Sequence, residues 1–255
     1  MIDVDGLVKS LGGRAVLDGV TFRAPAGQVT GLLGPNGAGK TTTMRVLSTL
    51  LRPDAGTVHV NGVDIAKDPE GARRIIGLVT EEPGLLDRLT VREQLLFTAR
   101  AYGASTATAT RRIEMLVEAL GVAGHLDART GTLSKGNRQK VSLCRAIVHD
   151  PPILLLDEPT SGLDVVAASA LEDLLRLDEV SGNKTVLLST HRLEEAERLA
   201  SRVVGIVGGR VVVDSTPDEL VIASGAANFR DAFVRILASS AFDTPVPQEP
   251  VVGSV

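Results

Sequence analysis

The chain has 255 residues, a formal net charge of −4, one cysteine, one tyrosine, five phenylalanines and no tryptophan. A chain of this length buries about 70–75% of its unfolded surface, so it needs no disulfide, and a single thiol indicates a reducing compartment. The slightly acidic balance and the few aromatic side chains argue against a nucleic-acid partner. We also expect no secretory signal and no membrane-spanning helix, because no apolar run reaches about 18 residues.

The N-terminal part predicts strands followed by a helix. Apolar residues alternate with polar ones around Ile2 and Val4 and again up to Phe22, which predicts antiparallel strands. The apolar run 29–33 ends in a glycine-rich turn and predicts a buried strand. We predict a helix from about residue 39 to residue 50, because a proline follows shortly after.

The middle of the chain changes from strands to helices. An Asn-Gly pair within 57–65 predicts a hairpin, and 75–79 predicts another short strand. From about residue 90 to residue 148, apolar residues recur on one face at helical spacing, which predicts three helices. We place a loop at 103–110 between the first two helices, and Ser134 as the N-cap of the third.

Short strands return in the last third of the chain. The run 153–156 is entirely apolar and predicts a buried strand. Beyond it we predict a helix at 165–178, a strand at 185–188, a helix from 193, a strand at 203–207 and a hairpin into 211–213. Short apolar strands that alternate with helices predict an α/β domain with a mostly parallel sheet.

The helical middle interrupts the strand-rich parts of one domain. We therefore predict a single domain at 1–235, with core segments 1–83 and 147–225 and a helical subdomain at 84–146. Phe229, Phe233 and Ile236 predict a short closing helix. The last dozen residues hold three prolines and show no periodicity. We predict a partly disordered tail at 236–255.

A phosphate-binding loop is the strongest chemical signal. Residues 34–41 read Gly-Pro-Asn-Gly-Ala-Gly-Lys-Thr and lie between a predicted strand and a predicted helix, as the pattern G-x-x-x-x-G-K-[ST] requires. Backbone N–H groups and the helix dipole would bind phosphates, Lys40 would neutralise them, and Thr41 would ligate Mg²⁺. The predicted nucleotide-binding residues are Gly34, Pro35, Asn36, Gly37, Ala38, Gly39, Lys40, Thr41 and Thr42. The alternative is a glycine-rich turn that fits by chance.

Two carboxylates follow the apolar run 153–156. In a parallel sheet, the carboxyl end of that strand would lie beside the phosphate-binding loop. We predict that Asp157 holds Mg²⁺ and that Glu158 polarises the attacking water as a general base. The alternative is that both residues are ordinary solvent-facing charges.

Four segments carry a family resemblance. They read Leu-Ser-Lys-Gly-Asn-Arg-Gln-Lys at 133–140, Asp-Glu-Pro-Thr at 157–160, Ser-Gly-Leu-Asp at 161–164 and Ser-Thr-His at 189–191. In order and spacing they are similar to a signature motif, an extended Walker B motif, a D-loop and a switch-histidine region. With these segments the chain, from Ile2 to about Phe233, resembles the nucleotide-binding subunits of ABC transporters.

The resemblance implies a fold, an activity and partners. The fold is a P-loop NTPase core of the RecA-like type, with an N-terminal antiparallel β part and an inserted α-helical subdomain. The activity is hydrolysis of ATP, with Mg²⁺, coupled to transport through a separate integral-membrane permease. Two copies of the subunit would enclose two ATP molecules. The chain would be cytoplasmic and bound to the inner face of the cell membrane through the permease.

The resemblance also implies roles for residues outside the loop. In a dimer, the ATP of one copy would be closed off by the signature residues of the other, here Ser134, Lys135, Gly136 and Asn137. Asp164 would contact the phosphate loop of the other copy, and His191 would reach the γ-phosphate and the attacking water. From the residues alone, Ser134 and Asp164 also fit as helix N-caps, and an isolated histidine is more often structural.

Three sites depart from the family pattern. Lys135 and Asn137 stand where the commonest signature has Gly and Gln, a form that resembles sodium-export ATPases. Glu81 stands in place of the Q-loop glutamine and is a candidate Mg²⁺ ligand. Leu11 stands where the family stacks an aromatic ring on adenine. Because leucine packs on a base without a π-face, we predict weak discrimination between ATP and GTP.

The segment 84–92 resembles subunits of the second ABC export class. An exporter of sodium ions, drugs, lipids or glycans is therefore expected, with permease contacts around 81–90 that include Asp87, Arg88 and Leu89. The alternative is a soluble ABC ATPase that acts on ribosomes or DNA. Such proteins usually carry two cassettes or a long coiled coil, which this chain lacks.

Overall fold

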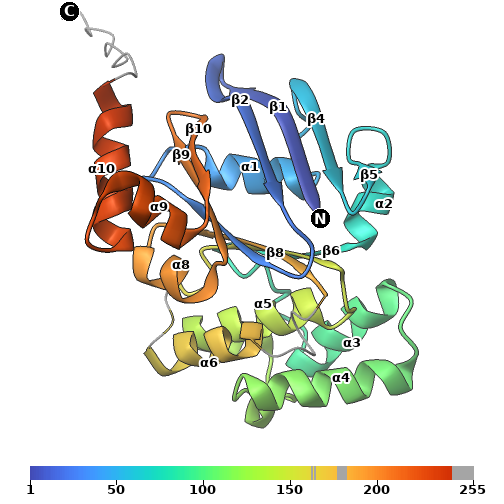
Figure 1. Ribbon diagram of the computed structural model, residues 1–255. Helices are drawn as coiled ribbons and strands as arrows, with labels where there is room; N and C mark the ends of the chain where they lie inside the picture. Colours follow the sequence, from blue (N-terminus) through green and yellow to red (C-terminus); the bar gives the residue numbers. More distant parts are fainter. Residues whose placement is uncertain (162, 164, 177–182, 243–255) are drawn as a thin grey trace, which may run out of the picture.

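An antiparallel sheet forms at the N-terminal end of the chain (Figure 1). The computed structural model describes residues 1–161, 163, 165–176 and 183–242. In this part the first sheet has the strand order β2-β1-β4-β5. Its strands are β1 (Ile2–Leu11), β2 (Arg14–Ala24), β4 (Ala55–Val60) and β5 (Val63–Asp64). β1 pairs with β2, and β4 with β5, in the antiparallel sense that the sequence predicted.

A second, mostly parallel sheet forms the centre of the molecule. Its order is β10-β9-β3-β8-β7-β6. All of its neighbouring strands pair in parallel except β10, which pairs antiparallel with β9 at one edge. The strands are β3 (Val29–Leu33), β6 (Ile76–Val79), β7 (Ile153–Asp157), β8 (Thr185–Thr190), β9 (Arg202–Val207) and β10 (Arg210–Ser215). The predicted parallel sheet is confirmed.

Strand β7 is buried along its whole length. Its apolar side chains divide between two hydrophobic clusters. Leu154 and Leu156 pack with the helical part, whereas Ile153 and Leu155 pack on the side of the antiparallel sheet. This two-sided burial explains why the sequence of β7 is continuously apolar rather than alternating.

The carboxyl ends of β3, β7 and β8 meet at one edge of the parallel sheet. Asp157 at the end of β7 pairs with Ser189 on β8, and the next residue of β8, Thr190, pairs with Leu33 at the end of β3. The loops that follow these strands therefore emerge side by side, which is where ligands bind in sheets of this type.

Helices cover the parallel sheet. In Figure 1, α3 to α6 lie together on one side of it, whereas α1 contacts both β7 and β8 and the antiparallel strand β2. No helix in the described ranges is long and apolar enough to cross a membrane. The helices are α1 (Lys40–Leu47), α2 (Pro69–Arg74), α3 (Val91–Ala101), α4 (Thr106–Ala119), α5 (Lys135–Ile147), α6 (Val165–Arg176), α8 (Leu193–Leu199), α9 (Pro217–Ser224) and α10 (Phe229–Phe242).

Several helix boundaries differ from the sequence-based expectation. The loop expected at 103–110 is shorter, because Ser105 caps α4 and accepts a hydrogen bond from the Thr108 N–H at 3.2 Å. α1 ends at Leu47 rather than near residue 50. α10 is longer than the predicted closing helix and includes the first part of the segment expected as a tail. Residues 243–255 of that segment lie outside the described residues. The domain boundaries themselves stay a prediction.

Candidate functional site

The loop between β3 and α1 wraps around the ammonium group of Lys40. Its Nζ donates hydrogen bonds to the carbonyl oxygens of Gly34 at 2.8 Å and Pro35 at 3.2 Å. The loop passes so close to its neighbours that a Cβ at residue 34 would clash with the Ile206 carbonyl, and one at residue 39 would lie 2.6 Å from Leu17. Both glycines also have positive φ angles, 155° and 113°, which other residues rarely adopt.

Helix α1 begins at this loop without a side-chain cap, since Gly39 is its N-cap. Its first N–H groups are therefore available to an anion. Burial lowers the pKa of Lys40, while the nearby carboxylates of Glu158 and Asp157 act in the opposite direction. A bound phosphate would favour the charged ammonium further, so the loop is built for an anionic ligand.

Asp157 supplies a buried carboxylate opposite the loop. It is 4% exposed, and its Oδ1 has no hydrogen-bond partner within the part of the chain that the structure describes. Burial is the main cause that raises the pKa of Asp157, and the charges of Glu158 and Glu81 raise it too, whereas the Ser189 and Thr41 hydroxyls lower it. An unsatisfied carboxylate oxygen next to a threonine hydroxyl fits a divalent cation.

The donor set suits Mg²⁺ in particular. Among the described residues no cluster of three or more His, Cys, Asp or Glu side chains could hold a metal alone. Mg²⁺ is usually bound by one or two carboxylates together with phosphate oxygens of the substrate, rather than by a complete protein cage. Thr41, Asp157 and Glu81 are the residues here that would share it with a phosphate.

Glu158 and His191 form a pair at the edge of the site. His191 Nδ1 lies 2.9 Å from both carboxylate oxygens of Glu158. Glu158 has φ 49°, a conformation that is strained for a residue with a side chain. Its N–H donates to the Ser189 carbonyl at 2.9 Å, and its carbonyl accepts from the Ser161 N–H at 3.0 Å. These backbone bonds hold the carboxylate toward the loop despite the strain.

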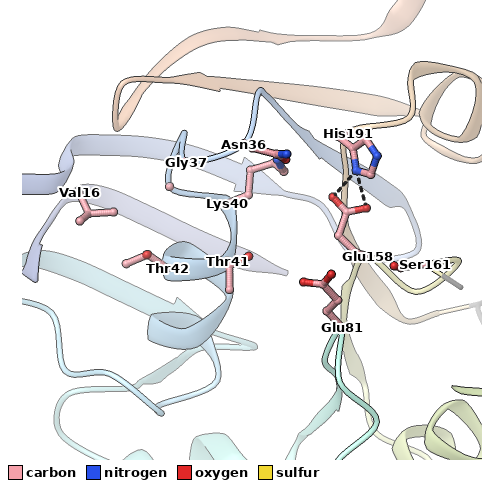
Figure 2. Close-up of a pocket in the computed structure, with 11 residues that line it drawn as sticks. Val16, Asn36, Gly37, Lys40, Thr41, Thr42, Glu81, Glu158, Ser161 and His191 are labelled. Atoms are coloured by element: carbon pink, nitrogen blue, oxygen red, sulfur yellow. Dashed lines mark hydrogen bonds and ion pairs between the residues drawn. The ribbon is translucent and has the colours of Figure 1, made fainter. Parts of the chain in front are cut away.

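One cavity of about 260 Å³ collects the loop residues, Glu81 and the Glu158–His191 pair, whereas Asp157 lines a neighbouring groove that shares Thr41 and Glu81 with this cavity. Figure 2 shows Glu81, Glu158 and His191 facing the loop residues across it. The lining residues are Val16, Asn36, Gly37, Gly39, Lys40, Thr41, Thr42, Glu81, Glu158, Ser161 and His191. The sequence did not assign Val16 or Ser161 to the site. Ser161 had a signal in its motif, but Val16 had none, because it reaches the cavity only through the fold of β2.

Other predicted loop residues lie around the cavity rather than along it. Gly34 and Pro35 hold Lys40 through their carbonyls, and Ala38 is buried in the hydrophobic core. Leu11, at the end of β1, is 39% exposed and does not line this cavity. Its role at a base therefore stays a prediction. Asp164 lies outside the described residues.

The signature residues lie away from the cavity at the start of α5. Ser134 caps this helix, as predicted, and accepts a hydrogen bond from the Asn137 N–H at 3.3 Å. The Asn137 side-chain amide lies 3.0 Å from His125 Nε2. Ser134 and Lys135 are exposed, and Gly136 is half-buried. None of these four residues lines the cavity of their own chain.

The geometry supports one kind of chemistry. A glutamate paired with a histidine faces a phosphate-binding loop with a buried lysine across one cavity, and an unsatisfied aspartate lies beside that cavity, near the same lysine. Such a site can bind a phosphorylated ligand, share a divalent cation with it, and deprotonate a water molecule beside it.

The sequence is similar to proteins of a known family. The family described as ABC transporter matches residues 17–161. Nod factor export ATP-binding protein I of Paraburkholderia xenovorans is 41% identical over 220 residues, which are 86% of this chain and 72% of that protein. Daunorubicin/doxorubicin resistance ATP-binding protein DrrA of Streptomyces peucetius is 40% identical over 225 residues, which are 88% of this chain and 68% of that protein.

The fold is also found in a solved structure described as the ATP-binding subunit of an ABC transporter. The two structures superpose with a TM-score of 0.87 and 34% sequence identity, over 93% of this chain and 99% of that one. The fold class that the motifs implied, a P-loop NTPase with a mostly parallel sheet, is confirmed.

Lys40→Ala should weaken the binding of ATP about a hundredfold, because each hydrogen bond from a charged group contributes about 1.5–3 kcal/mol. Lys67→Ala is the matched control, since the Lys67 side chain is 84% exposed and its ammonium group pairs with Asp64. A titration with a fluorescent ATP analogue measures both. If the two variants bind ATP equally well, the loop is not the phosphate site.

Proposed function

The chain belongs to the ABC transporter family, whose ATP-binding proteins hydrolyse ATP, and on this premise we propose that it is the ATPase subunit that drives a separate membrane permease for export. The observation that carries the proposal is the cavity in which Glu158 and His191 face the Lys40 loop. The curated relatives are named for the export of Nod factor and for daunorubicin resistance, which favours export over import.

ATP would bind with its β- and γ-phosphates in the loop. The loop N–H groups and Lys40 hold the phosphate oxygens, and the dipole of α1 adds to the attraction. Thr41, Asp157 and Glu81 are the residues that would hold Mg²⁺. When bound, Mg²⁺ would neutralise negative charge on the β- and γ-phosphates and on the transition state.

Glu158 would act as the general base of hydrolysis. Its carboxylate takes a proton from the water that attacks the γ-phosphorus, the bond to the bridging oxygen breaks, and ADP and phosphate leave. His191 keeps the carboxylate in place through the contact of 2.9 Å. Because this contact uses Nδ1, the second ring nitrogen remains for the γ-phosphate or the water.

A second copy of the chain would complete the site. The proposal is supported by the exposed start of α5, where Ser134 and Gly136 stand away from their own cavity. N–H groups at a helix start, together with a serine hydroxyl, can receive the γ-phosphate held by another copy. Each ATP would then lie between the loop of one subunit and the signature residues of the other.

The permease would dock beside the cavity, at the segment that follows β6. A groove of about 400 Å³ lies between α1 and this segment, and Glu81 lines both the groove and the nucleotide cavity. Leu50, which lines the groove, is 60% exposed. Leu86, which belongs to the segment after β6 but does not line the groove, is 55% exposed. A partner that covered both leucines would bury this exposed apolar surface. We further propose that this contact holds the chain on the cytoplasmic face of the membrane.

Hydrogen bonds tie the docking segment to α5. The Pro83 carbonyl accepts from the Ser142 hydroxyl at 3.1 Å, and the Gly84 carbonyl accepts from Arg145 at 2.6 Å. Asp87 forms an ion pair with Arg138 at 2.7 Å. Because α5 begins with the signature residues, a movement of those residues toward ATP would pull on the segment that contacts the permease.

Glu158→Gln should lower kcat for ATP hydrolysis at least about a hundredfold, because a general base contributes about 10²–10⁴-fold. ATP should still bind, and light scattering should show an ATP-dependent dimer that persists. Glu114→Gln, an exposed glutamate on α4, is the control and should hydrolyse ATP like the native chain. Unchanged hydrolysis by Glu158→Gln would contradict the assignment of the base.

The double variant Leu50→Asp and Leu86→Asp should detach the chain from membranes that contain its permease, because two charges would enter the docking surface. Ile222→Asp is the control, since Ile222 is 80% exposed on α9, far along the chain from the groove. The readout is the share of tagged chain recovered with the membrane fraction. Equal recovery of the native chain and both variants would place the permease contact elsewhere.

A further inference from the structure

The carboxyl group of Glu195 is buried close enough to Glu158 to interact with its charge. Glu195 lies in the first turn of α8 and is 1% exposed. Neither of its carboxylate oxygens has a hydrogen-bond partner among the described residues. A buried carboxyl without a partner is destabilising, more so when it is ionised. Neighbouring polar groups are therefore needed to stabilise the buried carboxyl of Glu195.

Two threonine hydroxyls face this carboxyl. Those of Thr160 and Thr190 lower the pKa of Glu195, although neither makes a hydrogen bond of full geometry to it in this structure. Arg192 donates a hydrogen bond to each of these hydroxyls. Its backbone N–H donates to Thr190 Oγ1 at 3.0 Å, and its guanidinium donates to Thr160 Oγ1 at 3.4 Å. Since each hydroxyl accepts from Arg192, its own O–H can point to the carboxyl.

The two threonines belong to the loops that carry the reacting groups. Thr160 comes two residues after Glu158, and Thr190 directly precedes His191. The backbones of these loops are joined where the Glu158 N–H donates to the Ser189 carbonyl. A carboxyl that engages both hydroxyls adds a second connection, made of side chains, between the same two loops.

Glu195 also interacts electrostatically with charged groups of the site. Burial raises the pKa of Glu195, the two hydroxyls and Arg192 lower it, and the negative charge of Glu158 raises it. The negative charge of Glu158 therefore acts directly on the Glu195 carboxyl. Glu195 does not line the nucleotide cavity, so any effect that it has on hydrolysis must pass through other residues.

We propose that Glu195 is a positioning residue for hydrolysis, whose buried carboxyl joins the Thr160 and Thr190 hydroxyls and so fixes Glu158 and His191 relative to each other. The inference rests on the proposed function, because it takes Glu158 as the base. It adds a residue that neither the sequence motifs nor the cavity point to.

Steady-state ATP hydrolysis by the full chain tests this role. Glu195→Ala should lower kcat about tenfold, because misplacement of a reacting group is costly even when it is small. KM and the measured affinity for ATP should change less than about twofold, since the phosphate loop is untouched. Glu195→Gln keeps the shape and one acceptor oxygen, and should restore kcat to within about threefold of the native value.

Glu194→Ala is the matched control. Glu194 is the preceding residue of the same turn, its side chain is 58% exposed, and it forms an ion pair with Arg230 at 3.6 Å. Its removal should leave kcat at the native value. If Glu195→Ala hydrolyses ATP as fast as this control, the proposal is overturned. It is also overturned if Glu195→Ala loses ATP affinity in proportion to kcat and Glu195→Gln restores nothing, because the role is then purely structural.

Two further variants keep the test decisive if Glu195→Ala does not fold. Thr160→Val and Thr190→Val preserve side-chain volume and remove the hydroxyls, so each should lower kcat while KM stays the same. Native kcat in both would overturn the proposal. A native chain that hydrolyses no ATP would contradict the proposed function itself, whereas an active native chain with an equally active Glu195→Ala contradicts the positioning role alone.

Discussion

The parallel pairing of β7 with β8 and β6 is the constraint on which the site depends. β7 must be apolar on both faces, because the helical part covers one side, and α1 together with the antiparallel sheet covers the other. The same pairing fixes Asp157 opposite Ser189, one strand away from the end of β3. A slip of one residue in this register would turn Asp157 into the core. The hydrophobic core and the charged site are thus set by one alignment of strands.

That alignment also creates an excess of negative charge. Asp157, Glu158 and Glu81 stand around one lysine, Lys40, and a triphosphate would bring more negative charge into the same small space. Hydrogen bonds from the loop offset part of this repulsion. A divalent cation would offset the rest, and the unsatisfied oxygen of Asp157 would then have a partner. Affinity for the nucleotide and affinity for the metal are therefore expected to depend on each other.

Local patterns in the sequence predicted most of the strands and the phosphate-binding loop. Alternation identified β1 and β2, the apolar run identified β7, and the glycine-lysine motif identified the loop, because each signal lies within a few neighbouring residues. Val16 and Glu195 were missed, since their places depend on how strands and helices pack. The loop expected at 103–110 was wrong because a short serine cap started α4 earlier than apolar spacing indicated. The role proposed for the signature residues involves a second copy of the chain and stays a prediction.

The affinity for ATP with and without Mg²⁺, compared between the native chain and Asp157→Asn, tests the central claim most directly. The account predicts that Mg²⁺ tightens ATP binding to the native chain by about tenfold or more, and that Asp157→Asn loses this gain. Without metal, the variant should bind ATP at least as well as the native chain, because one repelling charge is gone. The same gain from Mg²⁺ in both proteins would show that β7 does not deliver the metal ligand, and would contradict the account.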